Sequence, residues 1–272
     1  MTTVDTQQTG PAPSIWILIP AYNAEHQVAA VVRGARQTGL PVIVVDDGSS
    51  DQTRQQAQQA GALVLRHHAN RGKGAALQTG FAYARAQGAE AVLTLDADGQ
   101  HDTAEIPKLI ASWQSDPSSL VMGVRSFDPA LMPRRSRIGN HISTFFISLF
   151  AGRPHSDTQT GFRIYPRRLI SLPLSTRRFD TETELLLWAS KLAVPLREVP
   201  VQTIYRVPSS TTDDVSAAEG TTTEPTTSAP RTHFRNWEDT LRVLGLVVSS
   251  PWWRRHIPHS NPDDLRSHAR ST

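Results

Sequence analysis

Apolar and polar stretches alternate regularly along the first hundred residues of the chain. Four short apolar runs, rich in β-branched residues and leucine, predict buried strands at 15–19, 42–45, 62–65 and 91–95. The longer stretches between them predict helices at 25–37, 51–61 and 74–87. Near-continuous apolar strands that alternate with helices are typical of a mostly parallel sheet covered by helices on both faces. The pattern therefore predicts an α/β fold.

Polar segments follow three of the predicted strands directly, at 20–25, 46–51 and 96–101. Ligands of parallel α/β sheets bind beyond the carboxyl ends of the strands, so we expect these segments to form one binding edge. A fourth polar segment places glycines around Lys73 just before a predicted helix, which suits an anion. It is not a Walker loop, because Gly74 stands where Ser or Thr should follow the lysine.

Asp96 and Asp98 are two carboxylates one residue apart at the end of the fourth predicted strand. Such groups repel each other unless a cation lies between them, and hard divalent cations such as Mg²⁺ or Mn²⁺ prefer oxygen ligands. The alternative is a simple turn, because Asp and Gly are ordinary loop residues. Asp47 has a similar pair of interpretations: its carboxylate accepts hydrogen bonds from a ligand, or its segment is a turn with a cap for the next helix.

The composition narrows the classes of function. The chain has 272 residues, no cysteine and a formal net charge of +3, so thiolate metal sites and cysteine nucleophiles are excluded and an intracellular location is favoured. The first fourteen residues lack the layout of a secretory signal. No apolar run approaches the roughly 20 residues that span a bilayer. We therefore expect a globular protein that does not span a membrane by itself.

The region from 134 to 178 is locally cationic, with Asp157 as its one acidic residue. Its basic residues are Arg134, Arg135, Arg137, Arg153, Arg163, Arg167, Arg168, Arg177 and Arg178. An apolar stripe at helical spacing between 138 and 149 predicts a helix that ends near Gly152. Basic residues beside an apolar helix fit contact with an anionic membrane surface, and equally a core helix with solvated arginines. No sequence signature of nucleic-acid binding accompanies the charge, so nucleic acid is not an expected partner.

The C-terminal part divides into a polar segment and an apolar one. Residues 208–231 are dominated by Thr, Ser, Pro and acids and predict a disordered insertion, which is either a mobile lid or a passive surface loop. Asn236 is a suitable cap for a helix that runs to about 250, and Trp252 and Trp253 follow it beside two arginines. Tryptophans beside arginines suit an interfacial membrane anchor, and the alternative is a packing helix.

Four motifs of the N-terminal half resemble the family 2 glycosyltransferases, in the order and spacing of that family. They are IPAYN at 19–23, VDDGSSDQT at 45–53, NRGKGAAL at 70–77 and DADGQH at 96–101. The resemblance implies the GT-A fold of nucleotide-diphospho-sugar transferases, a Rossmann-like α/β domain with a mostly parallel sheet. It places a flexible N-terminus at 1–13, the GT-A catalytic domain at 14–206, the insertion at 207–231, the C-terminal helix at 232–256 and a flexible tail at 257–272.

The same resemblance implies roles for individual residues. The predicted contacts with the nucleotide sugar are Pro20, Tyr22, Glu25, Asp47, Lys73 and Asp96. The predicted ligands of Mg²⁺ or Mn²⁺ are Asp96, Asp98 and Gln100, and the predicted catalytic residues are Asp98, Arg125 and Arg163. The family has a branch that acts on polyprenyl phosphate, and many of its members have Asn and Glu adjacent in the first motif. In this chain Ala24 separates Asn23 from Glu25.

Motifs in the second half resemble the polyprenyl-phosphate branch of that family, typified by dolichyl-phosphate mannose synthase. They are GVRS at 123–126, GN at 139–140, DTQTGFR at 157–163 and EVPV at 198–201. This branch implies inverting transfer of a hexose from a GDP- or UDP-linked donor to polyprenyl phosphate, by a peripheral protein at the cytoplasmic face of the membrane. Guanidinium groups match phosphate bidentately, so the predicted contacts with the acceptor phosphate are Arg134, Arg135, Arg137 and Arg163.

Several alternatives stay open on the sequence. A saccharide or protein hydroxyl as acceptor would require a carboxylate base, and a non-catalytic nucleotide-sugar-binding protein would share the donor motifs. An acidic segment at 179–184 belongs to the second half, and the sequence does not identify which of its carboxylates faces the site. It also leaves open whether a membrane-protein partner or a second copy of the chain takes part.

Overall fold

The computed structural model describes residues 15–125, 160–176 and 180–202. By its contacts the chain divides into two units, Met1–Arg231 and Thr232–Thr272, and every described residue lies in the first. The segments predicted at 1–13, 207–231, 232–256 and 257–272 lie outside the described residues, as does the helix predicted between 138 and 149.

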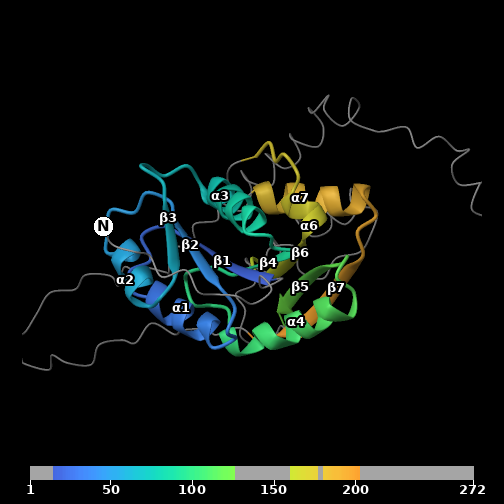
Figure 1. Ribbon diagram of the computed structural model, residues 1–272, viewed down its shortest axis with the longest axis horizontal. Coiled ribbons are helices and arrows are strands. Elements are labelled where there is room, and N and C mark those ends of the chain that lie inside the picture. Colours follow the sequence, from blue (N-terminus) through green and yellow to red (C-terminus); the bar gives the residue numbers. More distant parts are fainter. Residues whose placement is uncertain (1–14, 126–159, 177–179, 203–272) are drawn as a thin grey trace, which may run out of the picture. The chain divides into compact units, whose positions relative to one another are not determined.

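The described residues form one seven-stranded sheet in the order β3-β2-β1-β4-β6-β5-β7 (Figure 1). Its strands are β1 (Ile15–Ala21), β2 (Val42–Asp46), β3 (Leu63–Arg66), β4 (Ala91–Thr94), β5 (Leu120–Arg125), β6 (Arg163–Pro166) and β7 (Leu196–Val201). Strand β6 runs antiparallel to both of its neighbours, and the other pairings are parallel. The predicted mostly parallel sheet is confirmed.

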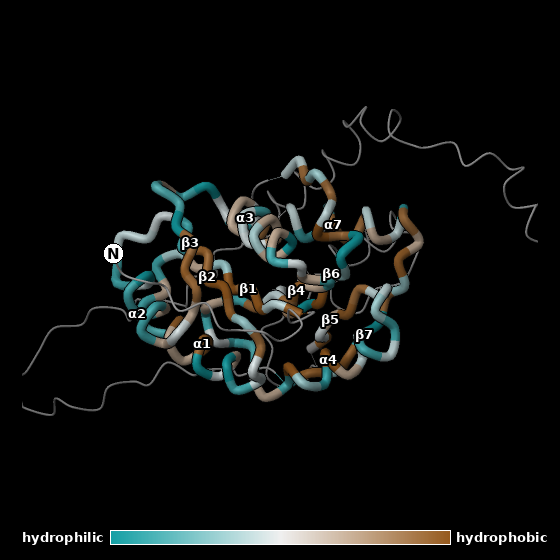
Figure 2. Tube along the Cα trace, in the orientation of Figure 1, coloured by the Kyte–Doolittle hydropathy of each residue, from teal (hydrophilic) through white to brown (hydrophobic). Residues whose placement is uncertain are grey.

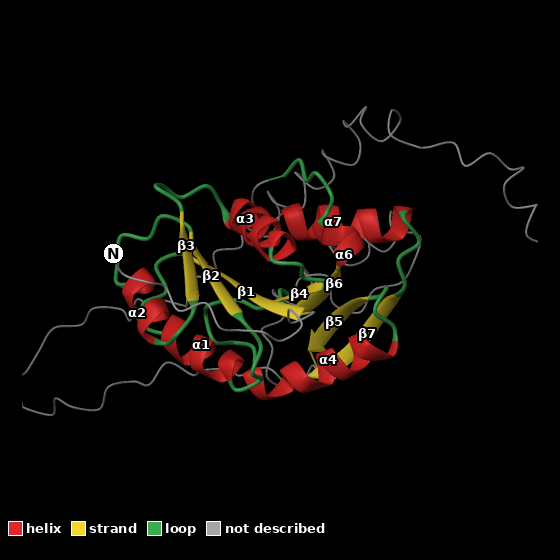
Figure 3. Ribbon diagram, viewed as in Figure 1, coloured by secondary structure: helices red, strands yellow, loops and turns green. Residues whose placement is uncertain are grey.

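Helices cover both faces of this sheet (Figure 3). They are α1 (Val28–Arg36), α2 (Thr53–Gln59), α3 (Lys73–Ala86), α4 (Ile106–Ser115), α6 (Arg167–Ile170) and α7 (Asp180–Lys191), with a 3-10 turn η1 (Thr103–Glu105) before α4. One face carries α3, α6 and α7, and the other carries α1, α2 and α4. No helix among the described residues is both long and apolar enough to cross a bilayer.

The apolar runs of the sequence are the buried strands of the sheet. Strand β2 is buried along its whole length, and Ile17, Val44 and Leu93 of three neighbouring strands are fully buried. The tube in Figure 2 is brown along these strands and paler or teal along much of the helices. Each fully buried aliphatic side chain contributes roughly 1.5–3 kcal/mol relative to exposure. This rigid layer fixes the positions of the loops that leave its edges.

Most element boundaries lie within one or two residues of the predictions, and α1 is the exception. Its predicted start was Glu25, and the helix begins at Val28. The backbone N–H of Glu25 donates to Asp51 Oδ2 at 3.1 Å, and its carboxylate accepts from the backbone N–H of Gln52 at 2.9 Å. These tertiary bonds hold Glu25 in the loop after β1 and tie that loop to the loop after β2.

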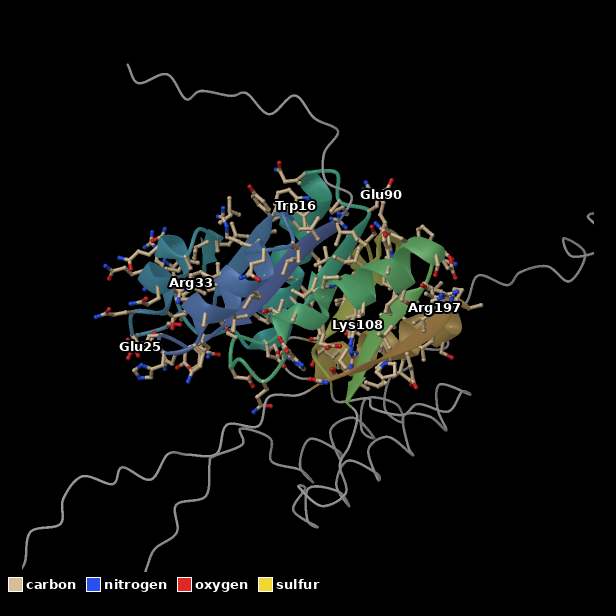
Figure 4. All side chains as sticks on the ribbon, turned by 90° about the horizontal axis from the view of Figure 1, so that it is seen from below. Trp16, Glu25, Arg33, Glu90, Lys108 and Arg197 are labelled. Atoms are coloured by element: carbon tan, nitrogen blue, oxygen red, sulfur yellow. The ribbon has the colours of Figure 1, made fainter. Side chains whose placement is uncertain are left out.

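The carboxyl ends of the parallel strands define one edge of the molecule. In Figure 4, Trp16 and Glu90 lie at one edge, near the amino ends of β1 and β4, and Glu25 lies at the opposite edge. Strand β6 pairs Arg163 with Thr94 at the end of β4. Because β6 is antiparallel, the residues that precede it reach the same edge as the loop that follows β4.

Candidate functional site

Asp96 and Lys73 form the centre of this edge. Asp96 lies just beyond the end of β4, and Lys73 is the first residue of α3. Lys73 Nζ lies 2.6 Å from Asp96 Oδ1 and 3.2 Å from Glu182 Oε1, where Glu182 belongs to the first turns of α7. The side chains of Lys73 and Glu182 are 15% and 9% exposed, so this ammonium bridges two carboxylates in a mostly dry setting.

The charges of this cluster determine its protonation. Burial alone would lower the pKa of Lys73, but the negative charges of Asp96 and Glu182 raise it above its ordinary value. Burial would likewise raise the pKa of Asp96, but the charge of Lys73 and the nearby ring of His101 hold it well below the usual range. Lysine and aspartate are therefore both charged at neutral pH.

Asp98 follows Asp96 by two residues in the same loop and is more exposed than Asp96. Partial burial and the charge of Asp96 both raise the pKa of Asp98 above its ordinary value. Its Oδ1 accepts a hydrogen bond from the backbone N–H of Gln100 at 2.9 Å. A carboxylate that is disfavoured by its neighbour's charge is stabilised when a cation joins the pair.

Gly161 packs directly against the carboxylate of Asp96. A β-carbon at position 161 would lie 2.6 Å from Asp96 Oδ2, closer than side chains tolerate. Thr94 Oγ1 donates to the carbonyl of Gly161 at 2.8 Å and fixes this approach. The segment before β6 therefore forms one wall of the Asp96 site, as the antiparallel direction of that strand requires.

His101 is a site residue that the sequence interpretation did not single out. Its Nε2 lies 3.6 Å from Asp96 Oδ2, its ring lies against Phe162 at 5.2 Å between centroids, and it is 7% exposed. No group in the described part of the chain hydrogen-bonds to its buried Nδ1. The sequence signal for His101 was its place five residues after Asp96, at the end of the same loop. The turn of that loop brings His101 back to the carboxylate of Asp96.

The acidic segment at 179–184 has three carboxylates, and the structure describes the side chains of two of them, Glu182 and Glu184. Glu182 faces Lys73. Glu184 accepts hydrogen bonds from the backbone N–H groups of Ser175 and Thr176 and from both of their hydroxyl groups. Glu184 therefore holds the turn before α7, and of these two described carboxylates Glu182 is the one that faces the site.

Asp47 ties the loop after β2 to the loop before α3. Its Oδ1 lies 2.6 Å from His67 Nδ1 and accepts from the backbone N–H of Arg71 at 3.0 Å, and its Oδ2 accepts from the N–H of Gly72 at 2.7 Å. The second ring nitrogen of His67 lies 2.8 Å from Thr79 Oγ1. Asp47 is 3% exposed, so much of its hydrogen-bonding capacity serves the loop that positions Lys73.

Tyr22 is a large aromatic residue that is nevertheless 51% exposed at the binding edge. Pro20 is buried inside β1 and pairs with Val45. Asn23 has φ of 49°, and its side chain accepts from the backbone N–H of Ser50 at 3.0 Å. These contacts lock the loop after β1 and leave the Tyr22 ring open to a ligand.

Arg163 lies beneath the site. It is fully buried, its Nε donates to the carbonyl of Thr160 at 2.8 Å, and its Nη1 donates to Tyr165 Oη and to the carbonyl of Glu182 at 3.3 and 3.2 Å. These bonds join the segment around Gly161 to the start of α7. The predicted contact of Arg163 with an acceptor phosphate stays a prediction, and this burial disfavours it.

The other predicted arginines lie outside what the structure describes. Arg125 ends β5, and its side chain is not among the described groups. Arg134, Arg135 and Arg137 fall in the range 126–159. Their predicted contacts with substrate stay predictions.

Asp96 and Asp98 fit a divalent cation that is shared with a substrate. Among the described residues no three or more His, Asp and Glu side chains gather into a complete metal cage. Mg²⁺ is usually bound by one or two carboxylates together with substrate phosphates and water. Two neighbouring carboxylates with an exposed outer member suit that arrangement, and the side chain of Gln100 is exposed beside them. Its role as a third ligand stays a prediction.

The chain is similar to a family of known enzymes. The model of the family described as glycosyl transferase family 2 matches residues 16–171. A UDP-N-acetylglucosamine–dolichyl-phosphate N-acetylglucosaminyltransferase of Methanococcus voltae is 32% identical over 70% of this chain and 86% of its own length. A dolichyl-phosphate beta-glucosyltransferase of Drosophila melanogaster is 30% identical over 74% of this chain and 70% of its own length.

A solved structure shares the fold. Glucosyl-3-phosphoglycerate synthase from Mycobacterium tuberculosis, in complex with Mn²⁺, uridine diphosphate and phosphoglyceric acid, superposes with a TM-score of 0.64. The match covers 91% of this chain and 80% of that one at 19% identity. At this identity the likeness establishes the architecture alone, and it agrees with the predicted GT-A fold.

Proposed function

The chain belongs to glycosyl transferase family 2, and from this premise we propose that it transfers a hexose from a nucleotide sugar to polyprenyl phosphate with inversion at the sugar carbon. The observation that carries the proposal is the pair Asp96 and Asp98 at the carboxyl end of β4, with Lys73 against the first of them. Such a cluster suits the diphosphate of an activated sugar.

UDP is the nucleotide that we favour for the donor. The relative from Methanococcus voltae is named for a UDP-linked sugar, and the exposed ring of Tyr22 offers a face on which a base can stack. Asp47 lies at the same edge, and its carboxylate oxygens are already engaged by His67 and by the backbone N–H groups of Arg71 and Gly72, so they can accept few further hydrogen bonds. We propose Tyr22 as the contact of the base and the loop of Asp47 as the contact of the ribose.

The leaving group is the chemical problem that the site solves. A nucleoside diphosphate leaves poorly until its negative charge is neutralised, and a divalent cation bound to Asp96 and Asp98 supplies that neutralisation. Lys73 adds a second positive charge at the same place. His101 and Gly161 confine the Asp96 carboxylate from two sides and keep its oxygens in position.

A phosphate acceptor can attack without a general base. A phosphate monoester has a second pKa near 6, so it is mostly dianionic at neutral pH. Its oxygen attacks the anomeric carbon, the bond from that carbon to the diphosphate oxygen breaks, and the electron pair leaves with the nucleoside diphosphate. Attack from the face opposite the leaving group inverts the carbon. Two relatives, named dolichyl-phosphate N-acetylglucosaminyltransferase and dolichyl-phosphate beta-glucosyltransferase, support this acceptor class.

The place of action follows from the acceptor. A polyprenyl phosphate lies in the membrane, so we propose that the protein works as a peripheral protein at the cytoplasmic face. The cationic region from 134 to 178 and the tryptophans at 252 and 253 are the parts of the sequence that suit this contact. A membrane-protein partner or a second copy of the chain remains compatible with that location.

A donor screen tests the proposed function. The full chain is incubated with Mn²⁺ or Mg²⁺, polyprenyl phosphate and a labelled sugar donor, in turn UDP-glucose, UDP-N-acetylglucosamine and GDP-mannose. The expected result is a labelled product that partitions into chloroform with one donor and that EDTA abolishes. We expect Asp96→Asn to lower this activity by about a hundredfold or more, and Asp116→Asn, which alters a carboxylate at the end of α4, to leave it unchanged.

Two outcomes would contradict the proposal in different parts. A labelled product that stays in water when a saccharide is added would move the acceptor to a hydroxyl and require a carboxylate base. Metal-dependent donor binding without turnover on any acceptor would favour a binding protein.

A further inference from the structure

Among the described residues Lys73 has two carboxylate partners, and they lie on different elements. Asp96 Oδ1 belongs to the loop after β4 and lies 2.6 Å from Nζ, whereas Glu182 Oε1 and Oε2 belong to α7 and lie 3.2 and 3.3 Å away. The closer partner is the residue proposed to hold the metal. Lys73 therefore contacts an oxygen that a divalent cation would also need.

An ammonium and a divalent cation compete for the same carboxylate oxygen. Two positive charges at one carboxylate repel each other, and the repulsion would be strong where the surroundings are mostly dry. Lys73 cannot leave the site at no cost, because its ammonium would lose two charge partners. Glu182 offers the alternative position, since its carboxylate already contacts Nζ and the side chain is 9% exposed.

We propose that Lys73 is the counter-ion of Asp96 in the donor-free protein, that a divalent cation must displace it, and that Glu182 retains the displaced ammonium at the site. The inference rests on the proposed function, because it takes Asp96 as a metal ligand. Glu182 is then a positioning residue that acts through Lys73. The retained ammonium stays available to a diphosphate instead of moving into solvent.

Substitution of Lys73 and substitution of Glu182 should change the affinity for Mn²⁺ in opposite directions. In Lys73→Met the competitor of the metal is absent, so Mn²⁺ binds more tightly. In Glu182→Gln the lysine loses its alternative partner and depends more on Asp96, so Mn²⁺ binds more weakly. General damage to the site would weaken Mn²⁺ binding in both variants, and the opposite signs therefore separate competition from damage.

The experiment is a titration of the full chain with Mn²⁺, read by electron paramagnetic resonance of the free ion, without nucleotide and again with UDP. We expect the dissociation constant of Mn²⁺ to fall about tenfold in Lys73→Met and to rise about threefold in Glu182→Gln. In the double variant the Glu182 substitution should have no further effect, because the two residues act through one contact.

Lys108 and Glu105 are the matched controls. They form an ion pair of 2.7 Å at the start of α4, with the glutamate buried as Glu182 is. Lys108→Met and Glu105→Gln remove the same charges away from the site, and we expect Mn²⁺ binding as in the wild type. Lys73→Arg keeps the positive charge, and we expect it to keep the weaker binding of the wild type.

The outcomes distinguish the two proposals. Mn²⁺ binding that is absent with and without UDP, or that Asp96→Asn leaves unchanged, would contradict the proposed function itself. Binding that depends on Asp96 but is unchanged or weaker in Lys73→Met would overturn the displacement of Lys73. An effect of Glu182→Gln that persists in the Lys73→Met background would show that Glu182 acts on the metal by its own charge. If Lys73→Met does not fold, an unchanged Mn²⁺ affinity in Glu182→Gln overturns the inference.

Discussion

Gly161 lies so close to Asp96 that a single added methyl group at position 161 would meet both carboxylate oxygens, at 2.6 and 2.9 Å. The two residues are 65 positions apart in the chain, and β6 brings them together by running antiparallel beside β4. The glycine is therefore part of the wall that fixes the carboxylate.

Gly161→Ala should impair the site more than it impairs the fold. The new methyl group forces Asp96 or the backbone to move by a few tenths of an ångström or more, and an error of about 1 Å at a reacting centre costs about a hundredfold in rate. We expect kcat to fall by about that factor, with a loss of roughly 1–3 kcal/mol in the free energy of unfolding. Transferase activity and urea unfolding measure the two effects.

Gly39→Ala is the control for this glycine. Gly39 has φ of +75° and nothing within 4 Å of an added β-carbon, so alanine there brings backbone strain of roughly 1–2 kcal/mol without a clash. We expect unchanged kcat in this variant. Equal loss of activity in both variants would mean that Gly161 affects activity through stability alone.

Asp47→Asn should loosen the loop that carries Lys73. An amide nitrogen would then face at least one of the N–H groups of Arg71 and Gly72, and a buried mismatch of this kind costs roughly 1–3 kcal/mol. We expect lower stability and weaker UDP binding by calorimetry. Asp116→Asn also alters a carboxylate that accepts a backbone bond, from Ser118, and should change neither. Tight UDP binding by Asp47→Asn would contradict a donor role for this loop.

Tyr22→Ala tests the proposed contact with the base. Tyr22 and Leu63 are the two exposed large apolar residues of the described part of the chain. Stacking of a base on an aromatic ring contributes about 1–3 kcal/mol, so we expect the KM for the donor to rise about tenfold in Tyr22→Ala with little change in stability. Leu63→Ala, on the edge strand β3, should leave the KM unchanged. Equal KM values in the two variants would remove Tyr22 from the donor site.

Tyr165 makes stability sensitive to alkaline pH. Burial raises the pKa of Tyr165 from about 10 to about 12. The folded protein therefore keeps the phenol neutral, and its contribution is present below pH 10 and is lost as the pH rises toward 12. Between pH 8 and pH 11 the free energy of unfolding of the wild type should fall relative to that of Tyr165→Phe by about 1.4 kcal/mol. Urea unfolding across this range checks it, and a constant difference would contradict the raised pKa.

The positions of the strands could be predicted from the sequence because the signal for a buried strand is local. The apolar runs of β1, β2 and β4 are predicted within a residue or two, since burial on both faces of a parallel sheet makes most positions of the run apolar. The predicted start of α1 at Glu25 is wrong, because the carboxylate of Glu25 accepts a hydrogen bond from the backbone N–H of Gln52 and the helix begins at Val28. Such a tertiary contact leaves no mark in the periodicity of the helix.

The site was predicted in part for the same reason. Asp96, Asp47 and Lys73 follow strands or precede a helix, so their common edge followed from the topology of a parallel sheet. The choice between Glu182 and Glu184 could not be made, because it depends on the rotation of α7 against α3. The contact of His67 with Asp47 could have been predicted from the sequence, because His67 directly follows β3, Asp47 directly follows β2, and these two strands are paired.

Calorimetry of UDP-sugar binding, with and without Mn²⁺, tests the central claim most directly. The claim is that Asp96 and its neighbours hold the diphosphate of the donor through a divalent cation. We expect wild type and Asp116→Asn to bind the donor at least about tenfold more tightly with Mn²⁺ than with EDTA, and Asp96→Asn to lose that gain. Donor binding that is equally tight with EDTA, or that keeps its dependence on Mn²⁺ in Asp96→Asn, would contradict it.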